Sequence, residues 1–387
     1  MKTTHAVSLF LWVATISAAL AAPVDWPCFR GPNHDGTLAE KFTLVGGEPE
    51  VLWRSKLGKG HASFAVVAGR LFTVAEGNTD SVLCLDARTG AKVWSVSHLH
   101  SVGESTPAVE GERVFLAHWG KSGPSAGALA TSDGRLLWQA PLPKSSGVSH
   151  YGAAGSPRVW EDLAFFNIAG GAAVRKDSGE VAWAHEGHTA YATPIMFTSK
   201  GRPAVAFFTG DSLIARDART GRELWTIPWK TSLHVSACDP VFLGDRVFLC
   251  SAYGRGRALY DVGGASPRTL WEEHKDGSGN SYSSGFVHRG GLLMFTGNGF
   301  ASLEVATGKV LWEYPGWGRT VLIGDTLVWL SHNGELAAGA FDPARKFEPT
   351  VRSQVLGGKT WNVPAYWDGK LYVRNEAGDV ACLKIAK

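Results

Sequence analysis

A hydrophobic residue followed by tryptophan recurs along this chain at nearly constant spacing. The seven copies are Leu52-Trp53, Val93-Trp94, Leu137-Trp138, Ala182-Trp183, Leu224-Trp225, Leu270-Trp271 and Leu311-Trp312. Successive tryptophans are 41, 44, 45, 42, 46 and 41 residues apart, and an eighth step reaches Val355-Leu356, where the tryptophan is missing. A period of about 40–45 residues is typical of units that contain four short strands. The tryptophans are therefore expected to pack between neighbouring sheets of a repeat protein.

Each repeat carries the same signals in the same order. It starts with a small residue before proline, as in Ser156-Pro157, and a β-branched and aromatic strand such as residues 113–116 follows a glycine-containing turn. A third strand runs into a polar turn, residues 86–90 in one copy, whose glycine permits a positive φ. The tryptophan strand ends the unit. With 47 glycines and 3 methionines the chain is also poorly suited to long helices. This order predicts an all-β fold, a β-propeller of four-stranded antiparallel blades.

The length of the repeat region predicts the number of blades. Residues 51–387 would hold eight units of about 42 residues. The eight predicted starts are near Ser63, Ser105, Ser156, Thr193, Asp239, Ser284, Arg319 and Val363. The last unit lacks a tryptophan strand, whereas residues 51–54 form such a strand without a unit of their own. We therefore predict an eight-bladed ring that is closed by pairing of the N-terminal and C-terminal strands, which removes open sheet edges.

Residues 1–21 have the layout of a secretory signal peptide. A lysine precedes an apolar run of 15 residues, Ala6 to Leu20, and a small residue, Ala21, precedes the expected cleavage site. A membrane anchor is the alternative, but a spanning helix needs roughly 20 apolar residues, and no later segment supplies them. The sequence predicts an exported protein, periplasmic or extracellular, with residues 22–50 as an N-terminal extension and residues 51–387 as the propeller.

Net charge and cysteine content limit which partners and metal sites the sequence supports. The net charge is +3 and no basic run occurs, which argues against nucleic acid as a partner. Five cysteines, an odd number in a predicted secreted chain, leave at least one unpaired. Neither a CxxC pair nor Cys/His spacing typical of zinc occurs, so no metal ligand is assigned. We expect a monomer without a transmembrane segment once the leader is removed.

The repeat unit resembles a known family. Its Leu-Trp strand, small-residue/proline start and Asp-Ala-x-Thr-Gly-x-x-x-Trp turn resemble the pyrroloquinoline-quinone (PQQ) repeat, and residues 25–36, DWPCFRGPNHDG, resemble a motif near the leader of exported bacterial members. The family has two branches. One contains PQQ-dependent alcohol and glucose dehydrogenases, and the other contains the BamB-like assembly protein, which uses the ring as a docking surface. The resemblance therefore implies the fold without choosing a function.

Comparison with each branch favours the BamB-like one. Membership of the alcohol dehydrogenase branch would imply a pair of adjacent cysteines, calcium ligands and long insertions. Here the closest cysteines, Cys238 and Cys250, are not adjacent, and the propeller leaves little length for insertions. The lipidated cysteine of the BamB-like branch is absent as well. We expect a non-catalytic binding or assembly module of the cell envelope, with no catalytic residue assigned. The alternatives are a PQQ-dependent oxidoreductase, with PQQ as its cofactor, and a carbohydrate-active enzyme whose site is at the channel mouth.

Bulky rings are expected where the innermost strands enter the central channel. The candidate ligand-binding residues at this axial mouth are His61, Glu104, His150, Tyr151, Tyr191, His234, Tyr282, Trp317, Arg319 and Trp361. Three interpretations stay open. The rings and the arginine could bind a small planar anionic ligand, a histidine could act as a general base near Glu104, or the rings could plug the channel or form a rim that docks an envelope protein.

Overall fold

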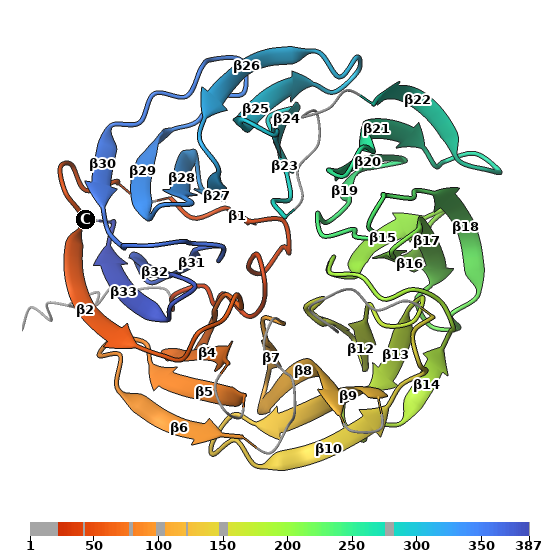
Figure 1. The fold of residues 1–387 in the computed structure, drawn as a ribbon, viewed down its shortest axis with the longest axis horizontal. Coiled ribbons are helices and arrows are strands. Elements are labelled where there is room, and N and C mark those ends of the chain that lie inside the picture. The colour runs from red at the N-terminus through yellow and green to blue at the C-terminus, as the bar shows by residue number, and fades with distance from the viewer. Residues whose placement is uncertain are drawn as a thin grey trace, which may run out of the picture.

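Eight small sheets surround a central axis (Figure 1). The computed structural model describes residues 22–41, 43–76, 80–97, 105–120, 123–146, 154–274 and 282–386. The described residues form strands and no helix, and hence none with the length and hydrophobicity of a membrane span. The predicted leader, residues 1–21, lies outside the described residues.

Each sheet is a blade of four antiparallel strands. The strands of each blade are given below in order from the axis outward. Blade 1 is β3 (Ala65–Val67), β4 (Arg70–Ala75), β5 (Ser81–Asp86) and β6 (Lys92–Val96). Blade 2 is β7 (Ala108–Glu110), β8 (Arg113–Gly120), β9 (Gly123–Ala130) and β10 (Leu136–Pro141). Blade 3 is β11 (Arg158–Trp160), β12 (Leu163–Phe166), β13 (Ala172–Arg175) and β14 (Val181–Ala184). Blade 4 is β15 (Ile195–Ser199), β16 (Arg202–Phe208), β17 (Ser212–Asp217) and β18 (Glu223–Pro228).

The remaining four blades follow the same plan. Blade 5 is β19 (Val241–Leu243), β20 (Arg246–Ser251), β21 (Gly256–Asp261) and β22 (Arg268–Glu273). Blade 6 is β23 (Phe286–His288), β24 (Gly291–Phe295), β25 (Gly299–Glu304) and β26 (Val310–Pro315). Blade 7 is β27 (Gly318–Ile323), β28 (Thr326–Ser331), β29 (Glu335–Ala340) and β30 (Val351–Gln354). Blade 8 is β31 (Ala365–Trp367), β32 (Lys370–Arg374), β33 (Asp379–Lys384) and β2 (Glu50–Lys56).

The two ends of the ring meet in blade 8. Strand β2 pairs antiparallel with β33, and Trp53 lies opposite Cys382 in this ladder. The predicted eight-bladed propeller, closed by an N-terminal strand on the C-terminal blade, is thereby confirmed. A short additional strand, β1 (Thr37–Leu38), pairs in parallel with the innermost strand of blade 7.

The recurrent tryptophans join consecutive blades, as predicted. Six indole N–H groups donate to a backbone carbonyl of the next blade: Trp53 to Ala87 at 3.1 Å, Trp94 to Thr131 at 2.9 Å, Trp138 to Lys176 at 3.0 Å, Trp183 to Ala218 at 3.2 Å, Trp271 to Val305 at 2.9 Å and Trp312 to Pro343 at 2.9 Å. The indole also covers the glycine of the polar turn. A Cβ atom at Gly221, where φ is +71°, would lie 2.6 Å from the Trp183 ring. The glycine is thus required by both conformation and close packing.

A partial ring of hydrogen bonds links the starts of the innermost strands, through blades 8, 1, 2 and 3 and through blades 4, 5 and 6. In each link a backbone N–H donates to a side-chain oxygen of the next blade: Val363 to Ser63 at 2.8 Å, Ser63 to Thr106 at 2.9 Å, Thr106 to Ser156 at 3.1 Å, Thr193 to Asp239 at 2.7 Å and Asp239 to Ser284 at 2.7 Å. Water cannot reach these buried N–H groups, so each needs an acceptor from the protein. The Ser, Thr or Asp side chain at these positions supplies that acceptor, which explains why such residues recur there.

Candidate functional site

The N-terminal extension runs through the centre of the ring. Trp26 exchanges two backbone hydrogen bonds with Val66 of β3, at 2.8 and 2.7 Å, and the Leu322 N–H of β27 donates to the carbonyl of Gly36 at 2.8 Å. These innermost strands belong to blades 1 and 7, and between the two contacts Arg30 of the segment reaches Asp239 at the start of blade 5. Residues 26–38 therefore cross the central channel.

Arg30 anchors this crossing segment. Its guanidinium forms an ion pair with Asp239 at 3.2 Å and donates to the carbonyl of Gly285 at 2.5 Å. The two charged side chains are 4% and 1% exposed. Burial raises the pKa of the Asp239 carboxyl, and the adjacent Arg30 opposes this rise. The pair is therefore a buried tie between the extension and the ring.

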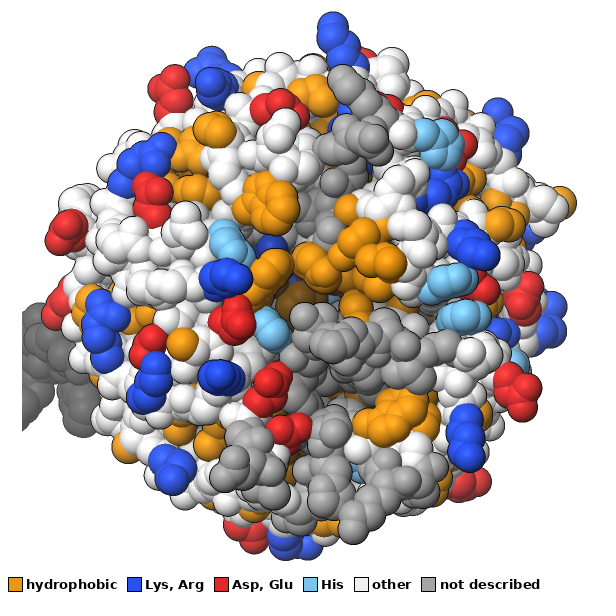
Figure 2. All heavy atoms as spheres, viewed as in Figure 1, with side chains coloured by type: hydrophobic (Ala, Val, Ile, Leu, Met, Phe, Trp, Pro, Cys, Tyr) orange, Lys and Arg blue, Asp and Glu red, His pale blue; other side chains and the backbone are white. Residues whose placement is uncertain are grey.

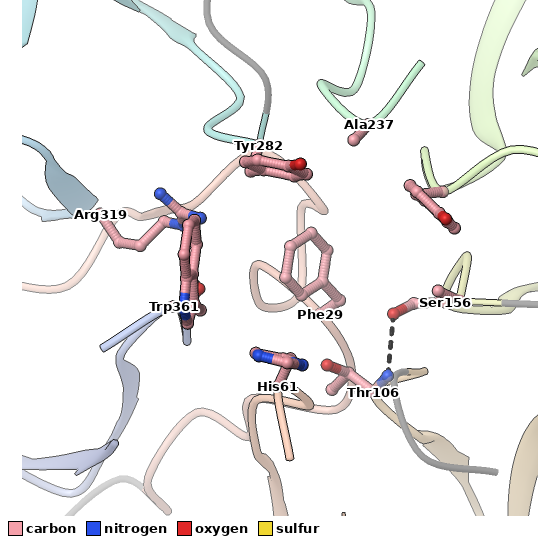
Figure 3. Close-up of a pocket in the computed structure, with 10 residues that line it drawn as sticks. Phe29, His61, Thr106, Ser156, Ala237, Tyr282, Arg319 and Trp361 are labelled. Atoms are coloured by element: carbon pink, nitrogen blue, oxygen red, sulfur yellow. Dashed lines mark hydrogen bonds between the residues drawn. The ribbon is translucent and has the colours of Figure 1, made fainter. Parts of the chain in front are cut away.

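A pocket of about 160 Å³ lies at the axis beside the extension. We call it the axial pocket, and its lining consists of Phe29, His61, Thr106, Ala154, Ser156, Tyr191, Ala237, Tyr282, Arg319 and Trp361. Figure 2 shows hydrophobic side chains gathered around a hollow at the centre of this face. In Figure 3 the Phe29 ring lies between Tyr282, Trp361 and His61, so the extension contributes to the wall of the pocket.

Trp361 is the centre of the aromatic wall. The ring centroids of Tyr282 and His61 lie 5.4 and 6.3 Å from its own, at interplanar angles of 84° and 80°. His332 packs edge-on against it at 4.7 Å. The Tyr282 hydroxyl also forms a hydrogen bond of 2.7 Å with that of Tyr253. Edge-to-face contacts are a favourable arrangement of aromatic rings, so these side chains hold one another in place.

Arg319 places a positive charge in this wall. Its Nε donates to the Trp361 carbonyl at 3.0 Å, and Nη1 donates to Ser283 Oγ and to the Gly318 carbonyl. Burial lowers the pKa of the guanidinium to about 10, so the group stays charged at neutral pH. Within the described ranges it forms no ion pair, and its Nη2 has no hydrogen-bond partner. A buried cation without a counter-ion is a favourable partner for an anion.

Comparison with known proteins agrees with this architecture. A family model described as outer membrane protein assembly factor BamB matches residues 47–190 and again residues 172–318. The chain belongs to the BamB family. The crystal structure of BamB from Moraxella catarrhalis superimposes with a TM-score of 0.62 at 15% identity, covering 87% of this chain and 97% of that one. No curated protein matches the sequence significantly.

Two other solved structures show how widely this architecture is shared. The quinohemoprotein alcohol dehydrogenase of Comamonas testosteroni has a TM-score of 0.68 at 13% identity, covering 94% of this chain and 80% of that one. The computationally designed Ika8 protein has a TM-score of 0.60 at 12% identity, covering 89% and 100%. At these identities the similarity shows the fold alone.

The structure brings half of the predicted site residues of this BamB-family chain together. His61, Tyr191, Tyr282, Arg319 and Trp361 line the axial pocket. Glu104, His150 and Tyr151 lie outside the described residues.

Two predicted residues are placed away from the axial pocket. The His234 ring stacks on His188 instead, with centroids 5.2 Å apart and planes 12° apart. Trp317 directly precedes β27 and lines a groove next to β26 and β28. Tyr282 and Trp361 lie four residues before β23 and β31, whereas Trp317 lies one residue before β27. His234 is predicted only as a ring close in sequence to Ala237, and it is Ala237 that lines the axial pocket.

Sequence reasoning missed several groups of the pocket. Phe29 lies in the conspicuous N-terminal motif, but nothing local indicates that this motif crosses the channel. Thr106 and Ser156 were identified only as repeat starts, although their hydroxyls line the pocket. His332 is isolated in the sequence and contacts Trp361 only in the fold.

The residues of the axial pocket do not fit PQQ, which is a fused-ring tricarboxylate. The pocket volume of about 160 Å³ is below the roughly 300–1,000 Å³ of typical small-molecule sites. Arg319 is the one cation of its lining, and the described part of the chain contains no group of three or more His, Cys, Asp or Glu arranged to hold a metal ion.

Proposed function

We propose that this protein is an exported, monomeric binding or assembly module of the cell envelope, without catalytic activity. Its docking point is the axial pocket, which receives an anionic group from an envelope protein. The observation that carries this proposal is Arg319, a buried guanidinium in an aromatic wall whose Nη2 is left without a described partner. A carboxylate that entered the pocket would acquire charge-assisted hydrogen bonds there.

The size of the pocket supports a protein group as the occupant. A volume of about 160 Å³ suits one inserted side chain or a carboxyl terminus rather than a large cofactor. The edges of Trp361, Tyr282 and His61 surround this space. Aromatic and arginine side chains often supply most of the binding energy of protein interfaces. These properties favour docking of a protein group in the axial pocket over a catalytic role for the pocket.

Location in the envelope is supported by two observations. Residues 1–21 have the pattern of a cleaved leader, and the matching family model is described as an outer membrane protein assembly factor. Fractionation of cells that express the full chain tests this part of the proposal, together with N-terminal sequencing of the product. Recovery of uncleaved protein from the cytoplasm would contradict export.

Site-specific capture tests the docking site. A photo-crosslinking residue in place of Lys359, two positions before Trp361 in the chain, should trap one envelope protein during growth. Additional Trp361→Ala or Arg319→Met substitutions should abolish the adduct, whereas Leu311→Ala, which changes an exposed side chain of the outer strand β26, should leave it intact. An adduct that survives the pocket substitutions, or no adduct at all, would overturn the proposal.

A separate assay tests the absence of catalysis. The purified protein is incubated with PQQ and calcium, and dye reduction is measured with alcohols and aldose sugars. We expect no turnover above that of the Arg319→Met variant. Turnover that depends on Arg319 would favour the oxidoreductase alternative.

A further inference from the structure

A second and larger hollow lies between blades 6 and 7. Its volume is about 790 Å³, within the usual range for small-molecule sites. It is lined by side chains from β26, from the connection into β27 and from β28 to β30, which include Trp317, Trp329, His332, Asn333, Arg352 and Gln354. We call it the blade 6/7 groove. None of the interactions described for the axial pocket uses Trp317.

Trp317 presents a flat apolar surface in this groove. It is 54% exposed, whereas Trp329 in the same groove is 4% exposed. The Trp317 indole N–H donates to the carbonyl of Gly297, and the Trp317 carbonyl accepts the His332 N–H at 2.7 Å. The first bond holds the ring although much of it faces solvent, and the second holds the backbone of Trp317. Because the ring is already held, little conformational entropy remains to be lost when a ligand stacks on it.

Two of the three charged side chains in the described lining of the groove, Arg352 and Glu335, compensate each other, and the third, Lys346, is exposed. Arg352 donates to Glu335 at 2.7 Å and also to the Tyr314 hydroxyl, and these bonds raise the pKa of the guanidinium. This arrangement contrasts with that of Arg319 in the axial pocket, which has no described counter-ion. Among the described lining residues the groove therefore has no buried charge that lacks a counter-ion, which is compatible with an uncharged ligand.

Hydrogen-bonding groups surround the exposed ring. The Gln354 amide donates to the Asn333 carbonyl at 2.7 Å and to the Leu356 carbonyl at 2.5 Å, which fixes its orientation. The buried indole N–H of Trp329 has no partner within the described residues. Amide, carboxylate and guanidinium groups can each exchange hydrogen bonds with hydroxyl groups. A neutral ring with an apolar C–H face and several hydroxyls would match both the indole and these polar groups.

We propose that the blade 6/7 groove is a binding site for a neutral saccharide, with one pyranose ring stacked on Trp317. The polar side chains at the edge of the groove hydrogen-bond the sugar hydroxyls. This site is independent of docking at the axial pocket, and it involves binding without cleavage of the sugar.

Calorimetric titration of the full chain tests this site. The probes are neutral oligosaccharides of glucose, mannose and N-acetylglucosamine at concentrations up to the millimolar range. At least one should bind the wild-type protein, and Trp317→Ala should weaken that binding about tenfold or more, which corresponds to about 1.4 kcal/mol. Trp317→Phe should restore part of the affinity.

Two matched variants make the result specific. Leu311→Ala removes an apolar side chain of β26 that is 47% exposed and lies outside the groove, and it should bind as the wild type does. Leu270→Ala removes an exposed apolar side chain from β22 in blade 5, outside the groove, and should also keep saccharide affinity. The proposal is overturned if no oligosaccharide binds the wild type, or if Trp317→Ala binds equally well. Trp317-dependent binding of a peptide in place of every sugar would likewise overturn it.

Discussion

Arg30 and Asp239 lie 209 positions apart in the sequence and form a buried ion pair of 3.2 Å at the centre of the ring. The same carboxylate accepts the backbone N–H of Thr193 in the preceding blade. One side chain therefore connects the N-terminal extension, blade 4 and blade 5. Through this contact the extension that supplies Phe29 to the axial pocket is held in the channel.

The ion pair predicts strong coupling between its two members. Asp239→Ser keeps a hydroxyl acceptor, as found at other repeat starts, but leaves Arg30 buried without its counter-ion, and Arg30→Met leaves the carboxylate unpaired. Each single variant should lose about 3–5 kcal/mol of unfolding free energy. The double variant should be more stable than the sum of both losses predicts. Urea denaturation of the four proteins measures this coupling. If the two losses of unfolding free energy simply add in the double variant, Arg30 and Asp239 do not stabilise each other.

The turn glycines should be far more sensitive than other glycines with positive φ. Gly221 has φ +71° and lies beneath Trp183, whereas Gly201 has φ +76° and no atom within 4 Å of the place that a Cβ would take. Gly201→Ala should cost about 1 kcal/mol from backbone strain alone. Gly221→Ala should cost about 1–3 kcal/mol more because the indole must shift. Thermal unfolding of both variants gives the comparison, and equal losses would contradict it.

The hydrogen-bond ring predicts an effect at the position where the first and last blades meet. Ser63→Ala leaves the Val363 N–H without its acceptor at 2.8 Å in a buried place. We expect a loss of about 1–3 kcal/mol in chemical denaturation. Ser81→Ala is the control, since its hydroxyl bonds that of Ser97 at the surface and should contribute less than about 0.5 kcal/mol. A loss for Ser63→Ala as small as the control would contradict the role of this ring in closure.

Acidification should destabilise the wall of the axial pocket through His332. Burial lowers the pKa of His332 below its ordinary value of 6.5, and the nearby Arg319 and Lys359 lower it further. The folded protein then binds this proton less tightly than the unfolded chain. Its contribution to stability is present above about pH 6.5 and is lost as the pH falls through the lowered folded-state pKa.

Unfolding temperatures measured at several pH values between neutral and mildly acidic test this contribution. His332→Gln should make the decline with acid shallower than in the wild type. An NMR titration of the His332 ring gives the pKa directly, and a pKa at or above 6.5 would contradict the prediction.

The candidate site was only partly visible in the sequence. Residues near the repeat starts, such as His61 and Tyr282, could be placed at the axis because the repeat period fixes where each innermost strand begins. Trp317 lies elsewhere because β27 begins at the next residue, and His234 because Ala237, three residues later, takes the place at the pocket. Phe29 was not foreseen because it lies outside the repeat.

The amino-acid sequence by itself determined the repeated blade, the number of blades and the closure of the ring. Each of these depends on contacts that recur with every repeat, such as Trp183 on Gly221, so the pattern appears many times in one chain. Only the tertiary structure decided what occupies the channel and which rings share the axial pocket. Contacts such as Arg30 with Asp239 occur once and join distant segments, and they leave no periodic signal to read.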